Sequence, residues 1–137
     1  EALSSAALVL HAKRALGIFP EGTRSKKKEP PFLLPGKTGI ARLSASYPDV
    51  PVVPIGLMGT REFMTPSDHK LPRLWKRVAI SYGKPVTWWN WLEENVGLED
   101  LQVLADKDDH EVKSTLAGYY RKFTDDFMER IKEQGAP

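Results

Sequence analysis

The sequence contains no cysteine, and this absence excludes several kinds of site at once. Without thiols the chain can form neither disulfides nor thiolate zinc sites, and it has no cysteine nucleophile. No run approaches the roughly 20 apolar residues of a membrane-spanning helix, and the first residues lack the basic segment of a signal peptide. The composition of 41% hydrophobic and 28% charged residues in a chain of 137 predicts one globular domain, or a large part of one.

The chain opens on Glu1 rather than methionine, within a pattern typical of an amphipathic helix. We therefore expect it to be a piece of a longer protein. Its charge is uneven: residues 1–77 hold 13 Lys/Arg and 6 Asp/Glu, hence +7, whereas residues 78–137 hold 7 and 12, hence −5. The basic half favours anionic partners such as phosphate esters, nucleotides or a lipid surface, although a solvated surface with uneven charge fits equally well.

Hydrophobic periodicity predicts alternating helices and strands. Helices are expected over residues 2–14, 38–47 and 111–132, and one or two short helices within 88–104. Buried strands are expected at Leu16–Phe19 and Val50–Leu57, and a further strand with alternating side chains at Arg77–Gly83. A loop is expected over residues 20–36 and an irregular connection over 58–74. This order predicts an α/β fold with a mixed sheet flanked by helices, incomplete at its N-terminus, and with C-terminal helices.

The stretch IFPEGTRS, which ends at Ser25, follows an apolar run and places a carboxylate and a guanidinium three residues apart. Gly22 allows the backbone to approach a ligand closely, and the guanidinium of Arg24 suits a phosphate. The hydroxyl of Thr23 can add a donor, while Glu21 can orient Arg24 or accept a hydrogen bond from a substrate hydroxyl. The stretch thus predicts a site for an anionic, hydroxylated small molecule, or else a turn with a surface ion pair of little energetic weight.

The heptapeptide FPEGTRS resembles the third signature block of the glycerolipid acyltransferase family, whose members include 1-acylglycerol-3-phosphate acyltransferases. The stretch PGKTGIARLSASYPDVPVVPIGL, residues 35–57, resembles the stretch that follows in the family, with a fourth block at residues 52–56. RVAISYGKPV, residues 77–86, resembles the next strand and its Gly-x-Pro turn. We therefore interpret residues 1–137 as a single partial acyltransferase domain, with a motif-bearing part at 1–88 and a helical part at 89–137.

The resemblance implies two groups of site residues. The phosphate and glycerol part of an acyl acceptor would be bound by Glu21, Gly22, Thr23 and Arg24. The fourth block would shape the acceptor or acyl pocket through Val53, Pro54 and Ile55. From its position at a helix start, Lys37 is a further candidate for the same phosphate, and otherwise a solvated lysine.

The resemblance also implies an activity, namely transfer of an acyl group to the hydroxyl of a lysophospholipid such as 1-acylglycerol-3-phosphate, in phospholipid biosynthesis. Acyl-CoA or acyl-carrier protein would be the co-substrate, with no metal, no prosthetic group and no nucleic acid involved. The protein would lie at the cytoplasmic face of a membrane, peripheral or anchored by a missing N-terminal part. A non-catalytic module that binds anionic lipid or nucleic acid is the alternative.

The chemistry of that family depends on a His-x4-Asp block, whose histidine takes a proton from the acceptor hydroxyl. The chain has three histidines, and none is followed by aspartate at the required position. Five residues after His11, His69 and His110 stand leucine, leucine and threonine. We therefore predict no catalytic residue in this chain, and no activity from the chain alone.

Three further stretches leave alternatives open. Residues 63–64 and 70–77 mix basic and apolar side chains, as in a segment resting on an anionic membrane or in a loop with a core tryptophan. The cluster Trp88–Trp91 can pack on the sheet and the C-terminal helix, face lipid, or stack on nucleic acid. The acidic residues 106–111 lack the glycine and ligand spacing of a calcium loop, so a helix cap by Asp108 or Asp109 is favoured.

Overall fold

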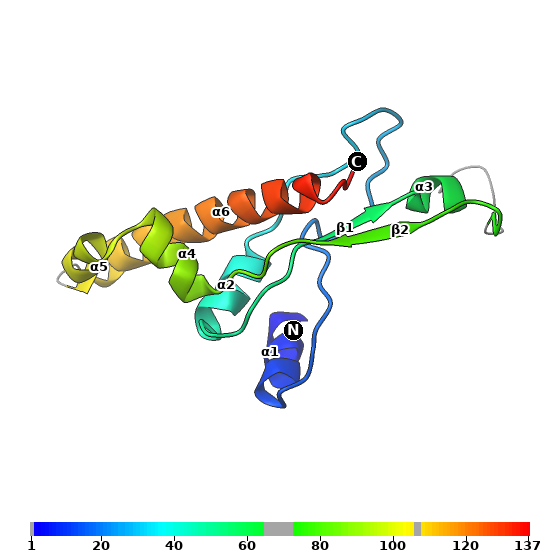
Figure 1. Ribbon diagram of the computed structural model, residues 1–137. Helices are drawn as coiled ribbons and strands as arrows, with labels where there is room; N and C mark the ends of the chain where they lie inside the picture. The colour runs from blue at the N-terminus through cyan, green and yellow to red at the C-terminus, as the bar shows by residue number, and fades with distance from the viewer. Residues whose placement is uncertain (1, 65–72, 106–107) are drawn as a thin grey trace.

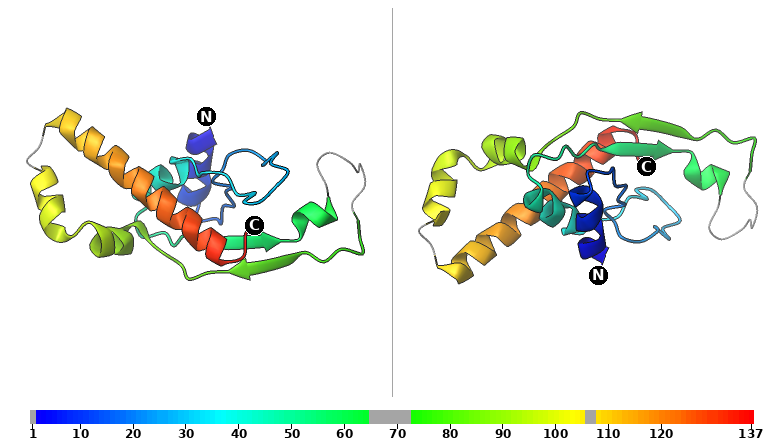
Figure 2. Two further views of the ribbon diagram at one scale, coloured as in Figure 1. Left: turned by 90° about the horizontal axis from the view of Figure 1, so that it is seen from above. Right: turned by 90° about the horizontal axis from the view of Figure 1, so that it is seen from below.

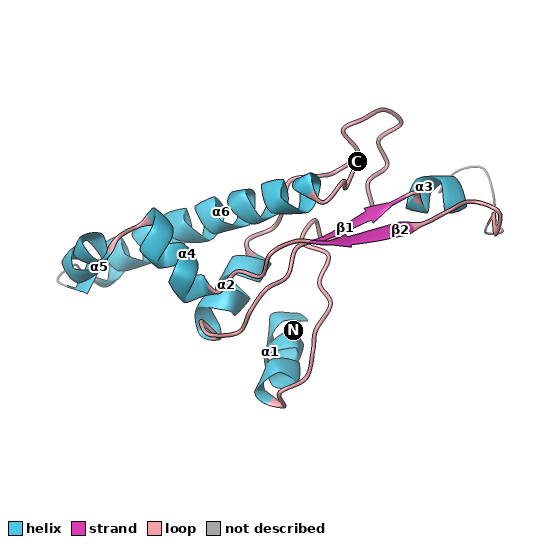
Figure 3. Ribbon diagram, viewed as in Figure 1, coloured by secondary structure: helices cyan, strands magenta, loops and turns pink. Residues whose placement is uncertain are grey.

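The computed structural model describes residues 2–64, 73–105 and 108–137, which form helices and a small antiparallel sheet (Figures 1 and 3). The helices are α1 (Ala2–His11), α2 (Gly39–Ser46), α3 (Thr60–Phe63), α4 (Trp88–Asn95), α5 (Leu98–Ala105) and α6 (Asp109–Glu133). The strands are β1 (Ile55–Met58) and β2 (Ala79–Tyr82). The predicted class, α/β with C-terminal helices, is confirmed.

The core lies where α2 and α4 pack on the apolar stripe of α6. The ring centroids of Trp88 and Phe123 are 5.1 Å apart, and those of Trp91 and Phe123 are 5.3 Å apart. The tryptophan cluster therefore packs on the C-terminal helix, as one of the open alternatives predicted, while Trp89 stays 48% exposed. Asp108 caps α6, because its Oδ1 accepts a hydrogen bond of 2.8 Å from the Glu111 amide.

The antiparallel hairpin packs one of its faces on the C-terminal end of α6. Ile55 pairs with Tyr82 across the two strands, and both side chains lie on the outer face, 41% and 67% exposed. On the inner face, a Cβ at Gly56 would collide with the backbone carbonyl of Gln134, and Ser81 Oγ donates to Gln134 Oε1 at 3.0 Å. Figure 2 shows that α4 and α5 lie at one end of the molecule and the far end of the hairpin at the other.

The predicted buried strand at Leu16–Phe19 is wrong. This segment forms neither a helix nor a strand, and Ile18 and Phe19 are 41% and 74% exposed. An apolar run becomes a strand only where its backbone groups find a partner to pair with. In the described part of the chain, β1 and β2 pair only with each other, and an isolated bridge joins Val52 to Val86.

Other predicted elements exist with different bounds. The first helix ends at His11 rather than at residue 14, and Lys13 then adopts a left-handed backbone with φ of 56°. The strand predicted at Val50–Leu57 begins only at Ile55, because the prolines before it lack the N–H group that a ladder needs. The connection predicted as irregular contains the short helix α3, and its residues 65–72 lie outside the described residues.

Candidate functional site

A tight turn at Gly22 forms the centre of the predicted phosphate-binding stretch. The Gly22 amide donates to the Phe19 carbonyl at 3.0 Å, and Gly22 has φ of 67°, a conformation that side-chain-bearing residues rarely adopt. A Cβ at this position would lie 3.0 Å from Lys37 Nζ and 3.1 Å from Lys37 Cε. The absence of a side chain at Gly22 therefore allows the Lys37 ammonium to lie directly over the turn.

Two hydrogen bonds tie this turn to the segment before α2. The Lys37 amide donates to the Pro20 carbonyl at 2.8 Å. The Leu34 amide donates to Glu21 Oε2 at 2.7 Å, a short distance of the kind expected for an ionised acceptor. The carboxylate of Glu21 thus fixes the loop, and among the described residues it forms no ion pair with Arg24. We call the hydrogen bond from the Leu34 amide to the Glu21 carboxylate the Glu21 latch.

The loop carries an excess of positive charge. Residues 20–37 contain five Lys/Arg and two Glu, a net charge of +3. Arg24 and Lys37 are exposed, as is Thr23, and Ser25 is half-buried. The ion pairs found in the described part of the chain all lie within α6. Neither Arg24 nor Lys37 therefore has a carboxylate partner among the described residues. Lys37 lies over the glycine turn and Arg24 follows Gly22 by two residues, and cations at a glycine turn suit a phosphate ester.

Helix α6 supports this loop from behind. Gly36 is buried, and a Cβ there would lie 2.8 Å from Thr124 Cγ2 and 2.8 Å from Met128 Cγ. The Gly36 carbonyl accepts a hydrogen bond of 2.9 Å from Arg121 Nη1. Arg121 is itself held by Asp125, with contacts of 2.9 and 2.6 Å. The sequence shows the i, i+4 spacing of this ion pair, but it gives no sign that Arg121 also reaches Gly36.

The fourth-block residues lie at the start of β1 and directly before it, and they differ in exposure. Pro54 is fully buried, and its carbonyl accepts a 2.8 Å hydrogen bond from the Gly83 amide. Val53 and Ile55 are 39% and 41% exposed. An open groove of ≈ 970 Å³ lies elsewhere, between residues 27–36 and α6, and is lined by residues such as Leu33 and Lys132. The role predicted for Val53, Pro54 and Ile55 stays a prediction.

The histidines of the described residues belong to elements other than this loop and lie on the surface. His11 ends α1 and His110 lies in the first turn of α6, and both are exposed. His69 lies outside the described residues. In the described ranges no three His, Asp or Glu side chains are grouped so that they could hold a metal ion. Nor does any helix within those ranges have the length and apolarity to cross a membrane.

Comparison with protein families gives one match. Residues 1–58 match the family model described as Acyltransferase, and the matched segment includes the Gly22 turn, Arg24 and Lys37. The match covers less than half of the chain, and it makes this segment similar to the acyltransferase family, which suggests acyl transfer. Comparisons with curated proteins and with solved structures give no match.

Proposed function

We propose that this chain is the acceptor-binding part of an enzyme that transfers an acyl group to a lysophospholipid such as 1-acylglycerol-3-phosphate, in phospholipid biosynthesis. The observation that carries the proposal is the exposed cationic turn at Gly22, which lies inside the segment that matches the acyltransferase family model. A phosphate monoester is the ligand whose charge and geometry best suit a guanidinium and an ammonium without carboxylate partners.

The proposed binding mode assigns a role to each residue of the turn. Arg24 contacts two phosphate oxygens through its planar guanidinium, and Lys37 adds a point charge from above Gly22. Thr23 donates its hydroxyl to the phosphate or to the glycerol part. Glu21 acts indirectly, because its carboxylate holds the loop through the Leu34 amide. Val53, Pro54 and Ile55 contribute to the acceptor or acyl pocket.

The proposed reaction needs a base that this chain does not supply. The acceptor hydroxyl must lose a proton as it attacks the thioester carbon of acyl-CoA or acyl-carrier protein, and the thiol leaves. None of the three histidines has the aspartate of a His-x4-Asp block, and His11 and His110 are exposed on the surface. We therefore propose that the 137-residue chain alone binds acceptor but does not turn over, and that no metal or prosthetic group is required.

The same proposal gives the protein a lipid environment. Its acceptor is a membrane lipid, so we place it at the cytoplasmic face of a membrane, as a peripheral protein or one anchored by an additional N-terminal part. Nucleic acid is not among the proposed partners. A non-catalytic module for anionic lipid or nucleic acid remains the competing function, and the experiments below discriminate between them.

Binding of a short-chain 1-acylglycerol-3-phosphate, below its micelle concentration, tests the acceptor site directly by calorimetry. Replacing Arg24 with alanine removes a charged hydrogen-bond donor, so we expect affinity to fall by about 10–100-fold. Arg14→Ala is the matched control, because Arg14 is an exposed arginine outside the loop. Equal affinities of the two variants, or equal binding of a monoacylglycerol without phosphate, would contradict the phosphate assignment.

Turnover is tested with acyl-CoA and a thiol reagent. Because the chain has no cysteine, released CoA is the only thiol in the assay. We expect no thiol release from the isolated chain, and measurable release would refute the assignment of the base to another segment. In an enzyme that also contains the His-x4-Asp block, Arg24→Ala should raise the acceptor KM or abolish activity while donor binding is retained.

A further inference from the structure

The far end of the hairpin carries an exposed turn with two large apolar side chains at its tip. The Lys76 amide donates to the Arg73 carbonyl at 2.9 Å, and the Arg73 amide donates to the Phe63 carbonyl at 2.8 Å. Leu74 and Trp75 occupy the two central positions of this turn, and they are 80% and 78% exposed. Trp75 is therefore not a core residue, so the interpretation of this segment as a loop with a core tryptophan is wrong.

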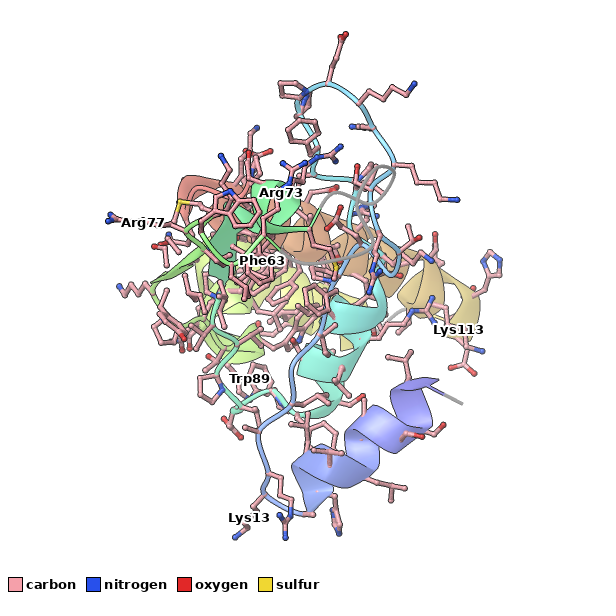
Figure 4. The ribbon with its side chains drawn as sticks, turned by 90° about the vertical axis from the view of Figure 1, so that its right-hand side faces the viewer. Lys13, Phe63, Arg73, Arg77, Trp89 and Lys113 are labelled. Atoms are coloured by element: carbon pink, nitrogen blue, oxygen red, sulfur yellow. The ribbon has the colours of Figure 1, made fainter. Side chains whose placement is uncertain are left out.

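Basic residues flank the two apolar residues of this turn in the sequence. Arg73, Lys76 and Arg77 lie within five consecutive residues, and residues 73–78 contain no acidic residue. Among the described residues, Glu62 in α3 is the acidic residue nearest to this turn in the sequence. Figure 4 looks onto this end of the molecule, where Arg77 extends from the edge and Arg73 lies near Phe63. An apolar tip with a basic rim is complementary to the headgroup region of an anionic bilayer.

The turn is well placed to reach such a surface. The hairpin projects it beyond the helical core, at the opposite end from α4 and α5 (Figures 1 and 2). The exposed apolar character continues through Val78, which is 43% exposed and precedes β2, and along β2 itself, where Ile80 and Tyr82 are 54% and 67% exposed. A nucleic acid would favour a row of cations with stacked aromatic rings, but the tip offers one ring beside an aliphatic side chain.

We propose that the turn Arg73–Arg77 is a membrane-docking element for anionic bilayers. The indole of Trp75 and the side chain of Leu74 enter the interfacial region, and Arg73, Lys76 and Arg77 contact lipid phosphates. This inference adds a contact site to the proposed lipid function, but it does not depend on acceptor binding at Gly22. The two are separable, because docking is measured without acceptor or thioester.

Sedimentation with vesicles tests the proposal. The probes are vesicles of phosphatidylcholine, alone or mixed with phosphatidylserine, at low and high salt. The unmodified chain should bind the mixed vesicles, more weakly at high salt, and bind phosphatidylcholine alone poorly. The double substitution Lys76→Gln and Arg77→Gln should lower the partition coefficient about 30-fold. The same change at Lys13 and Arg14, another exposed basic pair, should leave it within about twofold.

A second pair of variants tests the apolar tip. Trp75→Ala should lower binding to the mixed vesicles about tenfold or more. Trp89→Ala is the matched control, because Trp89 is also exposed but lies on α4 at the other end of the molecule. In a Trp89→Phe background Trp75 is the one exposed tryptophan, because Trp88 and Trp91 are buried, so vesicles should shift the tryptophan emission to shorter wavelength. All these substitutions are at exposed positions, so circular dichroism should show the same fold.

Three results would overturn the proposal. The first is equal vesicle binding by Trp75→Ala and Trp89→Ala. The second is equal binding to neutral and anionic vesicles. The third is tight, salt-sensitive binding to random DNA that the Lys76 and Arg77 substitutions abolish while vesicle binding is absent, which would assign the turn to nucleic acid.

Discussion

The Glu21 latch leads to a prediction that tests whether the Glu21 carboxylate stabilises the fold or contacts the ligand. Its Oε2 accepts the Leu34 amide at 2.7 Å in a half-buried setting. A hydrogen bond to a charged group contributes about 1.5–3 kcal/mol, and partial exposure to solvent favours the lower half of this range. Glu21→Ala should therefore lower the free energy of unfolding by about 1.5–2 kcal/mol. Glu21→Gln keeps an oxygen acceptor and should lose about half as much.

Chemical denaturation measures this effect. With a urea m-value of about 1–3 kcal/mol per M, Glu21→Ala should lower the midpoint by roughly 1 M. The matched control is Glu29→Ala, because Glu29 is an exposed carboxylate in the same loop and has no hydrogen bond or ion pair among the described residues. It should shift the midpoint by less than about 0.3 M.

Hydrogen exchange locates the effect. In Glu21→Ala the Leu34 amide should lose protection, whereas the Lys37 amide, bonded to the Pro20 carbonyl, should lose less. If Glu21→Ala and Glu29→Ala have the same midpoint, the latch contributes nothing and our reasoning is wrong. If stability is unchanged but acceptor affinity falls in Glu21→Gln, the carboxylate contacts the ligand instead.

Two further predictions concern backbone positions and a helix cap. Gly22→Ala should lower the free energy of unfolding by about 1–2 kcal/mol, because its φ of 67° is unfavourable for a residue with a Cβ, and it should weaken acceptor binding by displacing Lys37. Gly118→Ala, where a Cβ would meet open space on α6, should instead raise the free energy of unfolding by about 0.5–1 kcal/mol. Thermal midpoints that shift in the same direction in the two variants would contradict this reasoning. Asp108→Ala should lower stability by about 1 kcal/mol through loss of the cap to the Glu111 amide, and a thermal melt indistinguishable from that of Asp109→Ala would refute the assignment.

The sequence predicted the helices well because their signals are local. The stripe of Phe123, Phe127 and Ile131 repeats at helical spacing, and all three side chains are buried. The sequence predicts Asp108 or Asp109 as the residue that caps α6, and Asp108 accepts the capping hydrogen bond from the Glu111 amide. The strand at Leu16–Phe19 was predicted wrongly, because its apolar run looks the same whether or not another strand pairs with it.

The candidate loop was predicted from its residue types, but its internal contacts were not. Glycine, arginine and lysine favour a phosphate site through their chemistry, and that site is our proposal. The bond from the Leu34 amide to Glu21 joins positions 13 residues apart, and the bond from Arg121 to Gly36 joins positions 85 apart. Neither separation has a periodic signature, so only the folded chain reveals what Glu21 and Arg121 hold.

The C-terminal residues connect the parts of the molecule to which we assign function. Arg121 on α6 holds the loop through the Gly36 carbonyl, and the Pro137 carbonyl accepts the Leu33 amide at 2.9 Å. Gln134 at the end of the same helix holds the hairpin through Ser81. The proposed acceptor loop and the hairpin that carries the proposed docking turn are therefore both attached to one helix and the residues that follow it. If both proposals hold, α6 fixes the position of the phosphate-binding turn relative to the bilayer from which the acceptor comes.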